Sequence, residues 1–316
     1  MIPRLRAPLL SALALAALLP ACEPFLPGAG APASGPVLPS PTPATPPSPE
    51  SEAVRAYYAG VQTNLLSQGL LRTDGGARDT PFTDRQLAEN FIRIALFDEY
   101  VSERGVLVPA ASESRLRRWD GPIRMSVEFG ASVPDAQRLK DRGSVTAYAA
   151  RLSRLTGLPI AVGAADPNFT VLVLNEDERR TVGPRLRALV RGVDPAAVAA
   201  VVNMAPETYC TVFSFSSGKS AAYSRAIAVI RGEHPDLLRL SCIHEELAQG
   251  LGLVNDSPSA RPSIFNDDEE FALLTRQDEM LLRMLYDPRL KLGMTPDDAR
   301  PLVETIAVQL VGPGQG

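Results

Sequence analysis

The stretch EELAQGLGLVND, which begins at Glu245, constrains the fold of this chain more than any other segment. Glu245 and Gln249 are four residues apart, so in an α-helix they project from one face, one turn apart. Glycine readily adopts the left-handed conformation that ends a helix, so we expect the helix to stop near Gly250 or Gly252. The chain can then turn back and bring Asn255 towards the pair. The sequence therefore predicts three converging polar side chains.

The same stretch resembles the metzincin zinc-protease signature, H-E-x-x-H-x-x-G-L-x-H-D, with all three histidines replaced. Glu245, Gln249 and Asn255 stand at the histidine positions, while Glu246 keeps the general-base position and Asp256 keeps the family residue type. The resemblance implies a zincin-like α+β fold, a mixed sheet with flanking helices in which the signature helix follows the strands. It also makes Glu246 the candidate catalytic base and the other four the candidate binding residues.

The replaced histidines argue against a zinc centre. Zinc favours imidazole and thiolate ligands, whereas one carboxylate with two amide oxygens is a harder and weaker set. The chain has only two histidines, His234 and His244, so one molecule cannot supply three. A two-histidine site would need both brought together, and we favour a structural role for His244 in the helix. We expect no metal ligand and no cofactor; zinc or a hard divalent cation is the alternative.

The N-terminus reads as a lipoprotein signal peptide over residues 1–21. Arg4 and Arg6 supply the positive region, an apolar run follows, and the lipobox LPAC ends at Cys22, the expected site of lipidation. The proline in the lipobox leaves a plain secretory or tethered signal as the alternative. Lipid chains on Cys22 would anchor the protein to a membrane without a spanning helix. Glu23 favours the outer membrane over the inner one, with the domain facing the periplasm.

Residues 22–50 comprise the acylated cysteine and a linker rich in Pro, Ala and Ser, which cannot bury enough apolar surface to fold. Residues 51–312 contain no second such linker and no internal repeat, so we expect a single domain. The net charge of −4 argues against a nucleic-acid partner. The expected partners are the membrane, through the lipid, and an envelope protein or peptidoglycan.

Two cysteines remain once Cys22 is acylated. In an oxidising compartment an even pair is most simply a disulfide, here between Cys210 and Cys242. Two buried thiols are the alternative.

Hydrophobic periodicity predicts a sheet interleaved with helices. We expect an amphipathic helix from Thr83 to near Gly105, strands at 122–129, 169–174, 211–215 and 226–230, and helices at 133–155, 177–190, 235–250 and 273–286. Met280, Met284 and Met294 are interpreted as core residues rather than as a methionine turn under the site.

Three segments together resemble a proteobacterial lipoprotein family called domain of unknown function 2927. They are Cys242–Asp256, Ile264–Asp267 and Leu285–Lys291. The resemblance implies a zincin-like fold and an envelope location, but no established reaction.

Two functions follow from the sequence. The favoured one is a non-catalytic binding or structural role of a degenerate site, in which Glu245, Gln249 and Asn255 satisfy one another's hydrogen bonds. We also expect Asp256 to orient Asn255 or the site helix. The alternative is a metal-dependent hydrolase that acts on an envelope peptide or on peptidoglycan, with Glu246 as general base.

Overall fold

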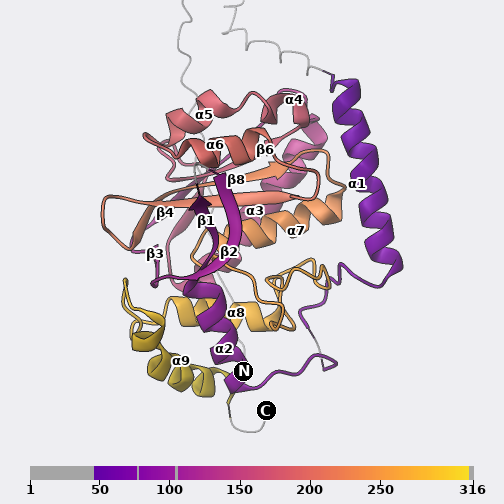
Figure 1. Cartoon of the computed structure of the whole chain (residues 1–316). Helices are drawn as coiled ribbons and strands as arrows, with labels where there is room; N and C mark the ends of the chain where they lie inside the picture. The colour runs from indigo at the N-terminus through magenta and orange to yellow at the C-terminus, as the bar shows by residue number, and fades with distance from the viewer. Residues whose placement is uncertain (1–45, 77, 104–105, 313–316) are drawn as a thin grey trace, which may run out of the picture. The chain divides into compact units, whose positions relative to one another are not determined.

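The computed structural model describes residues 46–76, 78–103 and 106–312 (Figure 1). The predicted signal peptide, Cys22 and most of the predicted linker lie outside these residues. The first helix, α1 (Pro49–Ser67), begins two residues before the expected domain boundary and is capped by the side chain of Ser48. No helix of the described part is long and apolar enough to span a membrane.

Six strands of the described chain form one mixed sheet, in the order β5-β4-β6-β8-β7 with the short β3 beside β8. Neighbouring strands are parallel except for β7, which pairs antiparallel with β8 at one edge. The bounds are β3 Arg118–Trp119, β4 Ile123–Phe129, β5 Ile160–Val162, β6 Phe169–Leu174, β7 Cys210–Ser216 and β8 Ala222–Arg231. The expected mixed sheet with flanking helices is confirmed.

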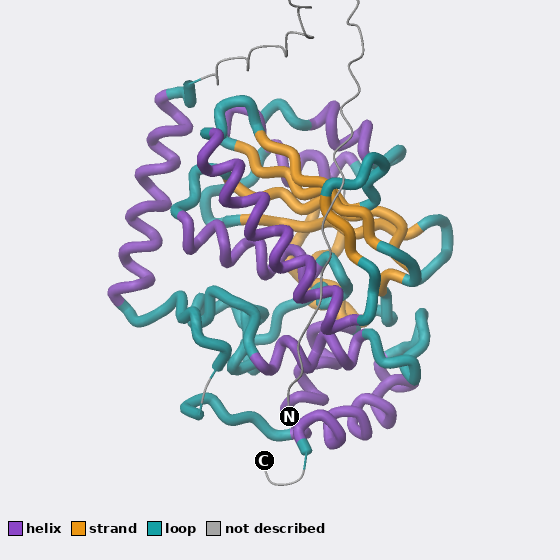
Figure 2. The backbone as a smooth tube through the Cα atoms, turned by 180° about the vertical axis from the view of Figure 1, so that it is seen from behind, coloured by secondary structure: helices purple, strands orange, loops and turns teal. Residues whose placement is uncertain are grey.

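The central strands are apolar on both faces because helices cover both. Leu172 of β6 and Ile227 of β8 pack against one helical layer, while Val171 and Ala228, one residue away, pack into the larger core on the other side. The helices α5 (Gly183–Leu189) and α6 (Pro195–Val202) cover the first face, and α3 (Asp135–Thr156) and α7 (Asp236–Gln249) cover the second (Figure 2). This double coverage explains the continuous apolar run FTVLVL of β6.

A second group of helices extends the larger core below α7 (Figure 1). It consists of α2 (Asp84–Ala95), α8 (Arg276–Leu285) and α9 (Pro296–Val311). Each begins with a threonine capping box, in which the threonine hydroxyl accepts from the third residue of the helix. Met280 and Met284 are buried in this core, as the interpretation of core packing requires.

The predicted helix from Thr83 to near Gly105 is wrong in its second half. The helix ends at Ala95, and the chain continues as β1 (Phe97–Glu103), which pairs antiparallel with β2 (Val106–Glu113). The apolar spacing carries on past Leu96, but the β-branched and aromatic residues there find a partner strand, and that pairing overrides the helical periodicity.

The predicted helix 177–190 is two helices. The short α4 (Glu176–Arg179) is separated from α5, which has a proline in its first turn. The helices α1, α6 and α9 and the β1–β2 hairpin were not anticipated from the sequence.

Candidate functional site

The helix predicted for the start of this stretch is present, and it ends where the glycines were expected to end it. Helix α7 ends at Gln249 with Gly250 as its C-cap, and Gly252 has a φ of 128°. The turn is fixed by side chains that donate to its carbonyl oxygens: Trp119 Nε1 to Gly250 at 2.9 Å and the Tyr286 hydroxyl to Leu251 at 2.8 Å. These donors satisfy carbonyl groups that the helix end leaves free.

The structure gathers six acidic side chains around the end of α7, here called the carboxylate cluster. Two come from the helix itself and one from the turn that follows; the others come from β1 and from the loop at 266–270. The six are Glu99, Glu245, Glu246, Asp256, Asp267 and Glu269. The sequence analysis therefore found three of the six and missed the rest.

The members of the carboxylate cluster differ in how much of their surface is exposed to solvent. Glu246 is the deepest, with 3 % of its surface exposed. Glu99, Glu245 and Asp256 are partly buried, and Asp267 is exposed. Burial within the cluster is therefore greatest at Glu246.

Burial and mutual repulsion raise the pKa of every member. Burial is the larger cause, and the charges of neighbouring carboxylates add to it. The pKa of Glu99 and that of Glu269 rise to about 7. For Glu246, burial, then the charge of Glu99 and then that of Asp256 raise the pKa well above the usual range. At neutral pH the cluster must therefore hold protons or a bound cation.

Two oxygen atoms of the cluster are left without a partner. Glu246 Oε2 and Asp256 Oδ1 are buried and have no hydrogen-bond partner among the described residues. The arginines nearby pair with a different residue: Arg72 and Arg261 both donate to Glu270, at 3.0 and 2.5 Å. No member of the cluster forms an ion pair with a Lys or Arg of the described part.

The backbone that carries the cluster is locally irregular. Asp267 and Glu269 have φ values of 60° and 57°, a region that costs a residue other than glycine about 1–3 kcal/mol. They are held there because Leu71 N donates to Glu269 O at 2.8 Å. The pairing of β1 with β2 is also interrupted at Glu99, between Asp98 and Tyr100. Strained positions of this kind concentrate at functional sites.

Gln249 and Asn255 are placed differently from Glu245. Asn255 donates from Nδ2 to Arg93 O at 2.9 Å and from its backbone N–H to Ile94 O at 3.1 Å, so it closes the end of α2. The side chain of Gln249 is buried and makes no hydrogen bond with a described residue. Glu245, Gln249 and Asn255 therefore do not satisfy one another, which corrects that part of the expectation. Asp256 does not bond to Asn255 either.

The two histidines have separate surroundings. His244 Nδ1 accepts from Leu274 N at 3.0 Å, and its ring stacks on Tyr148 at 4.0 Å. Burial lowers the pKa of His244 to about 3, so the ring stays neutral. His234 packs against Tyr58 and lies 3.7 Å from Cys242 Sγ. Neither contact points to a shared metal, and the structural role expected for His244 agrees with its bonding.

The residues present do not fit a zinc ion. The described residues contain no group of three or more His, Cys, Asp or Glu arranged to hold a metal. Of the three residues that replace histidine, Asn255 uses its side-chain amide to donate a hydrogen bond to Arg93 O in α2. An amide is also a poor zinc ligand. We therefore derive no chemistry through a metal.

The predicted disulfide is present. Cys210, at the start of β7, is bonded to Cys242, in the middle of α7. The bond ties the antiparallel edge of the sheet to the helix that carries Glu245 and Glu246.

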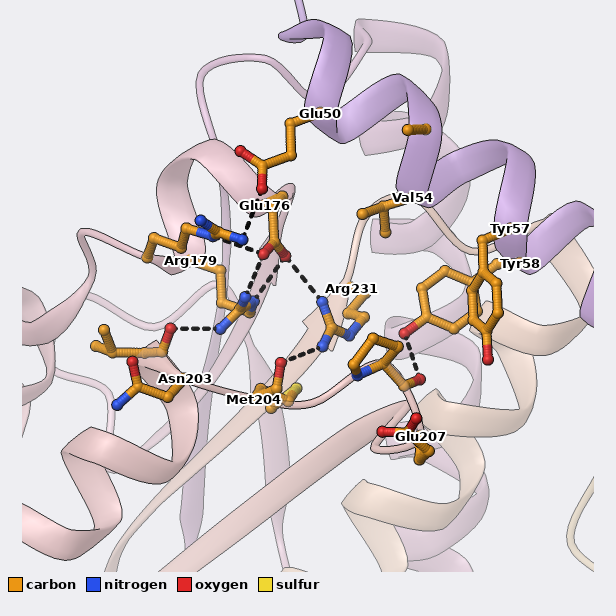
Figure 3. Close-up of a pocket in the computed structure, with 14 residues that line it drawn as sticks. Glu50, Val54, Tyr57, Tyr58, Glu176, Arg179, Asn203, Met204, Glu207 and Arg231 are labelled. Carbon is orange, nitrogen blue, oxygen red and sulfur yellow. Dashed lines mark hydrogen bonds and ion pairs between the residues drawn. The ribbon is translucent and has the colours of Figure 1, made fainter.

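A hollow with a volume of about 790 Å³ lies beside α1, away from the carboxylate cluster's residues (Figure 3). Its polar wall is Glu176, which accepts hydrogen bonds from Arg179 at 2.6 Å, Arg180 at 2.7 Å and Arg231 at 2.9 Å. Burial opposes the charge on Glu176, but these three arginines outweigh it and hold its pKa at about 2.

Most donors of the two buried arginines of this hollow, Arg179 and Arg231, are already used within the protein, since four of the five N–H groups of each form hydrogen bonds. Arg231 also donates to the carbonyl oxygens of Met204, Ala205 and Thr208, and Arg179 to those of Val201 and Val202. The network joins α4, β8 and the chain after α6. We interpret it as structural.

Residues 84–305 match the family model described as Protein of unknown function (DUF2927). The chain belongs to this family. The DUF2927 match includes every member of the carboxylate cluster and both disulfide cysteines, whereas α1 precedes it. No curated protein and no solved structure matches the chain.

The three missed members of the cluster differ in how visible they are. Asp267 and Glu269 stand in the acidic run NDDEE that follows the buried Ile264 and Phe265, so an unusual concentration of charge beside a buried segment was the available signal. Glu99 carried no such signal, because its position depends on a hairpin that was interpreted as helix.

Proposed function

We propose that the protein is a cell-envelope lipoprotein whose degenerate zincin-like site binds a ligand without catalysing a reaction. The observation that carries the proposal is the buried, unpartnered carboxyl of Glu246 in the carboxylate cluster. A buried polar atom without a partner is costly, so a site that keeps one is organised for something that completes it.

The zincin-like part of the proposal rests on order and position. A mixed sheet precedes α7, and α7 carries Glu245, Glu246 and Gln249 at the signature spacing before it ends at a glycine. The envelope part rests on the signal peptide and lipobox in the sequence, and the disulfide supports it because disulfides persist in oxidising compartments. We keep the outer membrane as the favoured location.

The absence of catalysis is argued from the state of Glu246. A general base works best when its pKa is close to the working pH. Burial, and then the charges of Glu99 and Asp256, raise the pKa of Glu246 well above its usual range, which disfavours the ionised form that a general base needs. The hydrolase alternative needs a cation in the site to reverse this.

Hydrolysis can be tested directly. The full chain is incubated with a mixed peptide library and with purified peptidoglycan, with and without added zinc, and new amino termini are counted. We expect no release above the buffer control. Cleavage that disappears in Glu246→Gln but persists in Glu304→Gln, an exposed control on α9, would replace this proposal with the hydrolase.

A further inference from the structure

The carboxylate cluster shows a charge imbalance that its surroundings do not correct. Six acids raise one another's pKa, and the arginines nearest the 266–270 loop are engaged elsewhere. Arg72 pairs with Asp74, Asp79 and Glu270, at 2.9, 2.8 and 3.0 Å. Glu270 is thus neutralised while its neighbour Glu269 is not. The described Lys and Arg residues supply no counter-ion to the cluster, so protons or a bound cation would balance its charge.

The deepest group of the cluster is also its unpartnered one. Only 3 % of the surface of Glu246 is exposed, and no group donates a hydrogen bond to its Oε2. Asp256 is partly buried, and its Oδ1 lacks a donor as well. A ligand that brought several N–H donors on one positive centre would satisfy both atoms.

An organic cation fits this geometry better than a metal ion. Metal ions require several oxygen atoms at fixed short distances, and the described residues contain no such group. An alkyl ammonium carries three N–H donors on a rotatable stem and can donate to carboxylates at varied angles. It therefore suits neighbouring acids that do not meet at one point.

The side chain of Tyr100, close to the cluster, offers a surface for the methylene stem of such a ligand. Tyr100 is 43 % exposed, and its hydroxyl feels the charges of Glu99, Asp256 and Asp267. An aromatic ring beside carboxylates packs against methylene groups and attracts a cation to its face. Exposed acids of the cluster, such as Asp267, would attract a cationic ligand electrostatically.

We infer that the carboxylate cluster binds the side-chain ammonium of a lysine in a peptide ligand, with the ammonium seated between Glu246, Asp256 and Glu245. The inference rests on the proposed function, since it names the ligand class of that same site. It extends the site from the signature helix to Glu99 and to the 266–270 loop.

The test compares three short peptides with the full chain by isothermal titration calorimetry at pH 8 and low salt. The first is a blocked Gly-Lys-Gly peptide, the second has norleucine in place of lysine, and the third has Nε-acetyl-lysine. We expect measurable binding of the lysine peptide only. Equal binding of the norleucine peptide, or no binding of any of the three, would overturn the inference.

The variants locate the site. Glu246→Gln should weaken binding of the lysine peptide about tenfold or more, which is the cost of losing a hydrogen bond between charged groups. Asp267→Asn keeps a residue that tolerates positive φ, and it should weaken binding without disturbing the loop. Glu304→Gln is the matched control and should bind as the wild type does. Unchanged binding in both cluster variants would overturn the inference.

The outcome separates the inference from the proposed function. Cleavage of the bound lysine peptide would contradict the non-catalytic function and leave the ligand class standing. A divalent cation that binds stoichiometrically, and that excludes the peptide, would overturn the ligand class.

Discussion

At the residue scale, the most informative atom is Glu246 Oε2. The side chain occupies the position that the zincin signature reserves for a general base, yet it is buried among other acids without a counter-ion in the described part. The identity of the residue suggested catalysis. Its environment instead favours the uncharged acid and leaves Oε2 without a hydrogen-bond donor. The chemical meaning of a signature residue thus depends on which neighbours the fold supplies.

Glu246→Gln tests this interpretation through stability. We expect the variant to fold. Its melting temperature at pH 8 should rise by about 2–4 °C, because replacing a buried carboxylate by an uncharged amide should raise the free energy of unfolding by about 1 kcal/mol. The gain should be smaller at pH 5, because a lower pH favours the uncharged form of the glutamate. Scanning calorimetry at both values gives the answer. A lower melting temperature at pH 8 would mean that the glutamate is structural.

Glu176 is the opposite kind of buried acid. It accepts hydrogen bonds from three arginines, which hold its pKa at about 2. We expect Glu176→Gln to destabilise the protein by about 3 kcal/mol, because it leaves Arg179 and Arg231 buried with an unbalanced charge. Urea unfolding at pH 7 measures the change. A loss below about 1 kcal/mol would show that the backbone carbonyls suffice for these arginines.

At the element scale, helix α7 is held at its middle and at its C-terminal turn. Its middle is tied to β7 by the disulfide, and its C-terminal turn is held by Trp119 and Tyr286. These restraints fix where Glu245 and Glu246 point relative to β1 and the 266–270 loop. The carboxylate cluster is thus a property of how elements meet, and α7 supplies only part of it.

The turn after α7 depends on Gly252. Its φ is 128°, and a Cβ there would lie 2.5 Å from Arg117 O. We expect Gly252→Ala to destabilise the protein by about 2 kcal/mol or more. Gly143→Ala, inside α3 with nothing within 4 Å of the added carbon, should instead stabilise it by about 0.5–1 kcal/mol. Equal effects of the two variants in urea unfolding would contradict this account of the turn.

The disulfide should contribute stability at the same scale. It closes a loop with a sequence separation of 32, for which the chain-entropy estimate is about 3–4 kcal/mol. We expect the double variant Cys210→Ser/Cys242→Ser to lose about 2–4 kcal/mol in urea unfolding. A double variant as stable as the wild type would show that packing alone holds α7 against β7.

At the scale of the whole molecule, the two kinds of buried acid predict an unusual pH dependence. Glu99 and Glu269 have pKa values of about 7 in the folded state, above their unfolded value, so the native state binds more protons and stability falls as pH rises from about 4.5 through 7. Glu176 acts in reverse: its contribution is present above about 4.5 and is lost as pH falls towards 2.

Maximum stability is therefore expected near pH 5. Urea unfolding at unit intervals from pH 3 to pH 8 measures it. A stability that climbs steadily from pH 5 to pH 8 would contradict the electrostatic description of the carboxylate cluster.

The sequence predicted the parts of the fold that depend on local pattern. The strand at 169–174, the helix of the signature stretch and the cysteine pair all follow from periodicity, glycine position and composition. The predictions failed where contacts between separate segments determine the structure. The residues after Leu96 continue a helical spacing but pair as a hairpin, so Glu99 was not recognised as part of the site. Asn255 was expected at the site, but the end of α2 takes its amide instead.

Zinc content tests the central claim most directly. The full chain is purified without chelator, incubated with excess zinc, desalted and analysed by plasma mass spectrometry beside the Glu245→Ala/Gln249→Ala variant. We expect folded protein with far less than one zinc per chain, and no difference between the two proteins. Stoichiometric zinc that the variant loses would mean that the site is a metal centre, and it would restore the hydrolase.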